Sequence, residues 1–204
     1  MNTITRIVGL GFACVLWFVS PGSRMEAKDS GAPSNTEKPG AVERAALARM
    51  GFVVGEWEGE GWSLDRSGQR QRFWAKESYR YRGDKDLLDM EGRFGGILAD
   101  GTRAAEQEYA LGILYFDRES QSYMMWHYSD DGTLFTVKMN VDIAQRSAYY
   151  LKTRAGGESG KFSLSIGEDG IWTAGLEILR PDNTWLKVME FRMKRRPTEP
   201  QVQQ

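Results

Sequence analysis

The feature that most restricts the fold of this chain is a succession of short segments in which apolar and polar side chains alternate. Alternation with a period of two places successive side chains on opposite faces and is typical of half-buried strands. The pairs Asp100-Gly101, Asp131-Gly132 and Asp169-Gly170 supply the positive φ that tight hairpin turns require. We therefore predict about ten antiparallel strands, over Phe52–Leu64, Arg70–Tyr81, Leu87–Gly95, Ala105–Phe116, Ser122–Ser129, Leu134–Ile143, Ser147–Arg154, Lys161–Ile166, Trp172–Leu179 and Trp185–Lys194.

Strands in this number, joined by hairpins, either stack as two sheets or close upon themselves. Closure leaves no unpaired edge, so we predict an all-β fold that forms an antiparallel up-and-down barrel. Before the first strand, residues 41–50 are rich in strong helix formers and place Val42, Ala45 and Ala46 at helical spacing. We expect one short N-terminal helix there, covering one end of the barrel, and a domain that runs over residues 41–196.

The first residues have the order of a secretory signal. Arg6 is followed by an uncharged apolar run from Ile7 to Val19 and then by small residues. We predict a signal peptide over residues 1–22, cleaved after Gly22, and a periplasmic or secreted mature protein. An uncleaved membrane anchor is the alternative, although the run is shorter than the roughly 20 apolar residues that span a bilayer. Residues 23–40 are predicted to be a flexible linker and residues 197–204 a flexible tail.

Cysteine content and charge exclude several classes of protein. The only cysteine, Cys14, lies within the predicted signal, so the mature chain has no disulfide, thiolate metal site or cysteine nucleophile. Lys and Arg number 27 and Asp and Glu 28, spread along the chain, which gives no indication of a nucleic-acid partner. The alternation turns charged side chains outward and apolar ones inward, the reverse of an outer-membrane barrel. We therefore expect no stable membrane insertion after signal removal. The oligomeric state stays open.

The stretch GEWEGEGW, from Gly55 to Trp62, indicates how the barrel begins. Alternation places Trp57 with the glycines on the inner face and the three glutamates in solvent. Glycines let a strand bend and let its neighbours approach closely, as a small barrel requires where it turns a corner. We expect Trp57 to close the floor of the barrel, with a cation of the last strand, Arg192, over its indole ring.

Inner-face residues of the following strands predict a ligand site. A mostly apolar pocket with a single orienting polar group is the usual composition of a small-molecule site. Glu77 is that polar group, because it shares the inner face with aromatic side chains and burial would raise its pKa. The alternatives are that Glu77 pairs with an inward arginine or lies at the solvated rim, and Glu177 raises the same question. The predicted ligand-binding residues are Trp57, Glu77, Tyr79, Tyr81, Met90, Phe94 and Met139.

The opening GEWEGEGW and the closing KVMEFRMKR resemble the calycin group, which contains the lipocalins with their Gly-x-Trp opening and closing arginine. The segments EGRFGG and ALGILYFDRESQSYMMWHYSDDGT are similar to those of bacterial lipocalin-like domains of unknown function. The resemblance covers roughly Leu47 to Arg195. It implies a lipocalin-like β-barrel and less about activity, because one fold hosts many functions.

A second resemblance concerns haem. Nitrobindin-type haem barrels open with a similar pattern, matched here by Gly55, Trp57 and the next two glycines of the strand. The resemblance implies a proximal histidine on the closing strand, where this chain has Val188 or a neighbour and no histidine. The single histidine, His127, lies in MMWHY, and a lone histidine on a strand is more often a packed or surface residue than an iron ligand. We therefore predict no cofactor, and no metal because a Gly-kinked calcium loop is missing.

These patterns lead to one function and three alternatives. The expected function is that of a secreted or periplasmic, non-catalytic protein that binds a small apolar or aromatic molecule inside the barrel. A barrel packed solid, with an envelope role, is one alternative. The others are a nitrobindin-type haem barrel and an isomerase or hydrolase that uses Glu77 or Glu177 beside a second polar group.

Overall fold

The computed structural model describes residues 40–153 and 159–197. The predicted signal, linker and tail lie outside the described residues, except for Gly40 and Pro197. Within the two described ranges, no helix has the length and apolar character needed to cross a membrane.

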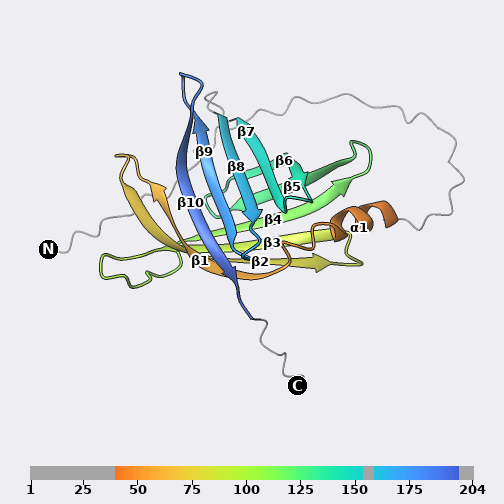
Figure 1. Cartoon of the computed structure of the whole chain (residues 1–204), viewed down its shortest axis with the longest axis horizontal. Helices are drawn as coiled ribbons and strands as arrows, with labels where there is room; N and C mark the ends of the chain where they lie inside the picture. Colours follow the sequence, from red (N-terminus) through yellow and green to blue (C-terminus); the bar gives the residue numbers. More distant parts are fainter. Residues whose placement is uncertain (1–39, 154–158, 198–204) are drawn as a thin grey trace, which may run out of the picture.

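The predicted barrel is confirmed: ten antiparallel strands close in the order β1-β10-β9-β8-β7-β6-β5-β4-β3-β2, so that each strand pairs with its sequence neighbour and β1 pairs with β10 (Figure 1). The elements are α1 Ala41–Ala48, β1 Gly55–Leu64, β2 Arg70–Arg82, β3 Leu87–Gly96, β4 Glu108–Asp117, β5 Ser122–Ser129, β6 Leu134–Asp142, β7 Ser147–Thr153, β8 Ser159–Ile166, β9 Trp172–Leu179 and β10 Trp185–Arg195.

The first strand begins later than predicted. Its predicted start is Phe52, whereas β1 starts at Gly55, because the backbone N–H of Val53 donates to the carbonyl oxygen of Met50 in a turn. The helix likewise ends at Ala48 rather than at Met50. The residues between α1 and β1 therefore form a tight connection that holds the helix against the barrel.

The Asp-Gly pairs form the predicted turns. Gly101 has a φ of +84°, a conformation that side chains with a Cβ rarely adopt. Asp100 Oδ1 accepts a hydrogen bond of 2.9 Å from the backbone N–H of Thr102, which fixes the turn. The pairs Asp131-Gly132 and Asp169-Gly170 share both features.

The glycines of β1 allow the barrel to close. A Cβ added at Gly59 would lie 1.9 Å from the carbonyl oxygen of Arg192, and one added at Gly61 would lie 2.4 Å from that of Glu190. Only a residue without a side chain lets β1 approach β10 this closely. The glycine-rich opening of the strand is therefore explained by the seam between the first and last strands.

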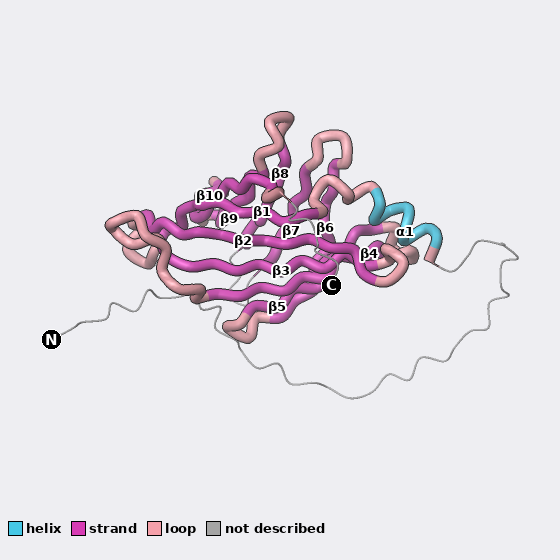
Figure 2. Tube along the Cα trace, turned by 90° about the horizontal axis from the view of Figure 1, so that it is seen from below, coloured by secondary structure: helices cyan, strands magenta, loops and turns pink. Residues whose placement is uncertain are grey.

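Helix α1 lies at one end of the strands (Figure 2) and supplies the most deeply buried apolar side chains there. Leu47 of the helix and Met50 of the turn that follows it are completely buried. Two tyrosine hydroxyls of the barrel bind carbonyl oxygens of the helix, Tyr81 that of Leu47 at 3.1 Å and Tyr123 that of Ala46 at 2.8 Å. The expectation that the helix covers one barrel end is confirmed.

The connection between β3 and β4 covers part of the outer wall. Trp74 points outward between its inward neighbours, yet it is buried under this connection, where its indole N–H donates to the carbonyl oxygen of Ala104 at 3.0 Å. Arg103 of the same connection forms an ion pair with Glu58 on β1. The sequence pattern does not reveal this outer contact, since it depends on how the loop folds back.

Candidate functional site: the barrel interior

The floor of the barrel is built from two tryptophans. Trp57 of β1 and Trp172 of β9 are each only 1% exposed, and their ring centroids lie 5.0 Å apart. The indole N–H of Trp57 donates to the carbonyl oxygen of Val53 at 2.8 Å, so its polar atom is satisfied. The predicted burial of Trp57 is confirmed, whereas Trp172 was missed by the sequence analysis.

The cation over Trp57 is not the predicted one. Arg195 lies over the indole, with its guanidinium carbon 4.6 Å from the ring centroid, and it donates to the carbonyl oxygen of Phe52 at 3.0 Å. Arg195 is the cross-strand partner of Trp57 and therefore shares its face, while Arg192 pairs with Glu60 and points outward. The prediction of Arg192 was wrong because it set aside the alternation of the closing strand.

Glu77 is a buried carboxyl group in the middle of the interior. It is 6% exposed, and its Oε2 accepts a hydrogen bond of 3.0 Å from the hydroxyl of Tyr79. Burial raises the pKa of Glu77 to about 7, and the hydrogen bond from Tyr79 opposes part of this shift. In the described part of the chain, no lysine or arginine forms an ion pair with Glu77. Both alternatives for Glu77, an inward arginine partner and a place at the solvated rim, are thus wrong.

Two tyrosines accompany Glu77. The ring of Tyr79 packs on Trp172 with a centroid distance of 4.9 Å, which places the Glu77–Tyr79 pair directly above the floor. Tyr150 of β7 also lies close enough for the charge of Glu77 to raise its pKa, although burial is the larger cause. Tyr150 was missed, because in the pair Tyr149-Tyr150 the alternation alone does not say which ring enters the barrel.

The half of the interior away from α1 carries aromatic side chains that stay partly exposed. Phe73, Phe94 and Phe191 contact one another edge to face, with centroids 5.7–6.3 Å apart. On the opposite wall, Tyr150 stacks on Phe162 at 5.4 Å. Of these rings, only Phe191 is fully buried. The interior is therefore filled at the helix end and lined by accessible aromatic rings at the other end.

His127 also faces the interior, on β5 in this aromatic half. Its ring stacks on Phe135 at 4.7 Å, and its Nε2 lies 2.9 Å from the hydroxyl of Ser129. Burial, with a smaller effect of the Lys152 charge, lowers the pKa of His127 to about 4, so the imidazole is neutral at pH 7. Its Nδ1 is buried without a hydrogen-bond partner.

The predicted ligand-binding residues do not all lie at one level of the barrel. Trp57, Tyr81 and Met139 lie toward the helix end, Tyr81 through its hydrogen bond to α1 and Met139 beside Tyr123. Met90 is buried beside Tyr79, which is its cross-strand partner. The predicted set therefore divides into a floor, a central group with Glu77 and Tyr79, and the aromatic half with Phe94. Their role in binding stays a prediction.

Glu177 lies on the other side of the wall. Its carboxylate forms an ion pair of 3.3 Å with Lys161, its cross-strand partner on β8, and both point outward. Glu77 and Glu177 therefore cannot act as a catalytic pair inside the barrel. Among the described residues, no three His, Cys, Asp or Glu side chains are close enough together to hold a metal ion.

Two depressions of the surface have volumes of about 270 Å³ and 290 Å³. The first lies on the outer face of β7 to β10, and the second is lined by Ile171, Arg192, Met193 and Lys194. None of the predicted ligand-binding residues lines either depression. The predicted cavity inside the barrel stays a prediction.

No protein-family model and no curated protein sequence matches this chain. The structure of Rv2717c from M. tuberculosis is similar, with 14% identity, coverage of 74% of this chain and 98% of that chain, and a TM-score of 0.51. The S-type phycobiliprotein lyase CPES from Guillardia theta covers 78% of this chain and 96% of its own at 11% identity, with a TM-score of 0.42. A de novo designed fluorescence-activating β-barrel covers 71% and 94% at 14% identity, with a TM-score of 0.33.

The barrel shares its overall fold with the structure of Rv2717c. At 14% identity, the similarity to Rv2717c concerns the fold alone, and the two lower TM-scores add nothing to it. The chemistry of the interior therefore depends on the side chains of this chain.

Proposed function

We propose that the barrel interior binds a small apolar or aromatic molecule that carries a hydrogen-bond donor, without chemical transformation of that molecule. The observation that carries this proposal is Glu77, a buried carboxyl group that has one tyrosine partner and, among the described residues, no cationic partner. Burying such a group costs stability unless it is paired, so its presence in an otherwise apolar interior indicates a functional role.

The surroundings of Glu77 favour a mostly apolar ligand. Rings of Phe94 and Phe162 remain partly exposed at the end away from α1 and offer flat apolar contacts. A hydroxyl or amine on the inserted end of the ligand would donate to the carboxylate of Glu77. One orienting polar group among apolar walls is the usual composition of a small-molecule site.

A matched pair of ligands tests this proposal. We expect 2-naphthol, which can donate a hydrogen bond, to bind about tenfold more tightly than 2-methoxynaphthalene, which cannot, because a hydrogen bond to a charged group contributes roughly 1.5–3 kcal/mol. The difference should disappear in Glu77→Leu and persist in Glu91→Leu, a control on the outer face of β3. Fluorescence titration of the purified full chain, as wild type and as the two variants, measures the six affinities.

Three outcomes would contradict the proposal. Equal binding of the two ligands to the wild type would show that no carboxylate receives the donor. A preference that survives in Glu77→Leu would place the site elsewhere. Binding of neither ligand would indicate a barrel packed solid.

The haem alternative has one observation in its favour, the inward His127 with an unpartnered Nδ1. Titration with haemin separates it from the proposal. A sharp Soret band that is lost in His127→Ala would make haem the better interpretation. Broad absorbance that does not depend on His127 would favour the apolar ligand over haem.

The isomerase or hydrolase alternative rests on the same carboxyl group. A pKa near 7 suits a general acid or base, and the hydroxyl of Tyr79 lies 3.0 Å away as a second polar group. Chemical change of a bound naphthyl ester or enolisable ketone that stops in Glu77→Gln would replace the binding role by a catalytic one.

We also propose export from the cytoplasm, on the charged, apolar and small-residue order of residues 1–22. Mass spectrometry of the protein expressed with its full N-terminus in a bacterial host should show a mature chain that begins at Ser23. A chain that keeps residues 1–22 would favour the uncleaved anchor.

A further inference from the structure

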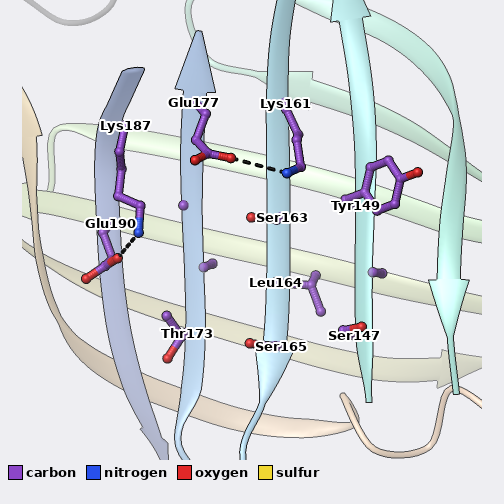
Figure 3. A pocket seen from close by; sticks show the side chains of 13 residues that line it. Ser147, Tyr149, Lys161, Ser163, Leu164, Ser165, Thr173, Glu177, Lys187 and Glu190 are labelled. Carbon is purple, nitrogen blue, oxygen red and sulfur yellow. Dashed lines mark hydrogen bonds and ion pairs between the residues drawn. The ribbon is translucent and has the colours of Figure 1, made fainter. Parts of the chain in front are cut away.

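The outer face of the barrel carries a depression unlike the rest of its surface. Its volume is about 270 Å³, and it lies over β7, β8, β9 and β10 (Figure 3). Short side chains form its base, because outward positions of these strands carry Ser147, Ser163, Ser165, Thr173 and Gly175. On β1 and β2, by contrast, outward positions carry long charged residues, such as the pairs Arg72–Glu60 and Arg80–Glu56.

The hydroxyl groups in this depression are available to a ligand. Within residues 40–153 and 159–197, the side chains of the three serines and of Thr173 make no hydrogen bond. Each hydroxyl both donates and accepts, so a row of them matches a ligand that also carries donors and acceptors.

The rim of the depression is charged but compensated. Lys161 forms an ion pair of 3.3 Å with Glu177, and Lys187 pairs with Glu190 (Figure 3). Two lysines and two glutamates leave no net charge, which disfavours a strongly anionic or cationic ligand. Within these pairs, the carboxylates can still accept hydrogen bonds from a neutral ligand, and the ammonium groups can donate hydrogen bonds to it.

One aromatic ring completes the rim. Tyr149 is 39% exposed and lies beside Ser163, its partner on β8. An exposed ring offers a flat apolar surface, on which the C–H face of a sugar ring can pack. Lys161 borders this ring, with its Nζ 5.9 Å from the ring centroid.

We propose that this outer depression binds a neutral saccharide. The hydroxyl groups and the compensated ion pairs recognise the sugar hydroxyls, and Tyr149 packs on the face of the ring. The volume is just below the roughly 300 Å³ at which small-molecule pockets begin, so one sugar ring fits it. A bound peptide strand is disfavoured, because the closed barrel offers a face here and no unpaired strand edge. This site is independent of the interior.

Saturation-transfer NMR with methyl glycosides of glucose, galactose and mannose tests the proposal on the purified full chain. We expect ring-proton signals from at least one glycoside, and an affinity loss of roughly fivefold or more in Tyr149→Ala. Ser163→Tyr, which fills the depression from a half-buried, outward position of β8, should remove the signal. Tyr128→Ala is the matched control, since Tyr128 is an outward tyrosine of β5 with 37% exposure.

The three variants distinguish binding in the depression from binding elsewhere on the barrel. Signals that fall in the two depression variants and persist in Tyr128→Ala support the site, provided that the circular dichroism spectra of the variants match that of the wild type. Absence of signal from all three glycosides would overturn the proposal. Signals in Tyr149→Ala and Ser163→Tyr that are as strong as those of the wild type would also overturn it. If a trisaccharide binds more tightly than the methyl glycoside of its terminal sugar, the bound ring is the end of a glycan chain. If the two bind equally, the ligand is a free sugar.

Discussion

Replacing Trp57 with alanine is expected to lower the free energy of unfolding by about 3–5 kcal/mol. The indole is 1% exposed and packs on Trp172, so its removal leaves a cavity in a fully buried part of the floor. Its loss also frees the carbonyl oxygen of Val53 and removes the ring beneath the guanidinium of Arg195. The floor of the barrel and the contact with α1 should both weaken.

Urea unfolding followed by circular dichroism measures this effect. Trp62→Ala is the matched control, because Trp62 lies on the same strand with its side chain outward, where the guanidinium carbon of Arg70 lies 3.9 Å from its ring centroid. The control should lose at most about 1 kcal/mol. Similar losses in both variants would show that the two faces of β1 are assigned wrongly.

The second large effect concerns the pH dependence of stability. In the unfolded chain Glu77 has an ordinary pKa near 4.5, and in the folded barrel burial raises it to about 7. Below the unfolded pKa the carboxyl is protonated in both states and has no effect. As the pH rises toward 7, only the unfolded state loses its proton, so the folded state loses relative stability. Above pH 7 the full loss, about 3 kcal/mol, remains.

Glu77→Gln removes this titration while keeping the size of the side chain. We expect the variant to be about as stable as the wild type at pH 4 and more stable by about 3 kcal/mol at pH 8. Glu91→Gln, on the outer face of β3 beside Arg93, should follow the wild type across the range. A difference between Glu77→Gln and the wild type that does not change between pH 4 and pH 8 would mean that water reaches the carboxylate in the folded barrel.

The strands and their faces were predictable because they depend on local patterns. Asp-Gly pairs fix the turns, and alternation fixes which side of the wall each residue occupies, as for Trp57 and Glu77. The late start of β1 was not predictable, because the turn after α1 forms through contacts with the helix.

The composition of the interior was only partly predictable. That Glu77 faces inward follows from the alternation of β2, but its partner does not, since Tyr79 could equally have bonded to another group. Trp172 begins its strand, where too few neighbours precede it to establish the face. The outward position of Glu177 was not predictable, because its neighbours in sequence are apolar. Its partner, Lys161, comes from a different strand.

The close approach of β1 to β10 has a consequence for how the chain folds. This pairing joins residues 57–63 to residues 189–195, the most distant contacts in sequence that the sheet makes. Contacts of high sequence separation slow folding, because a long loop must be ordered before they can form. Until β10 is synthesised, β1 keeps one unpaired edge, and the incomplete sheet can associate with another chain. Pairing of β10 with β1 thus determines when the chain passes from an aggregation-prone open sheet to a closed barrel.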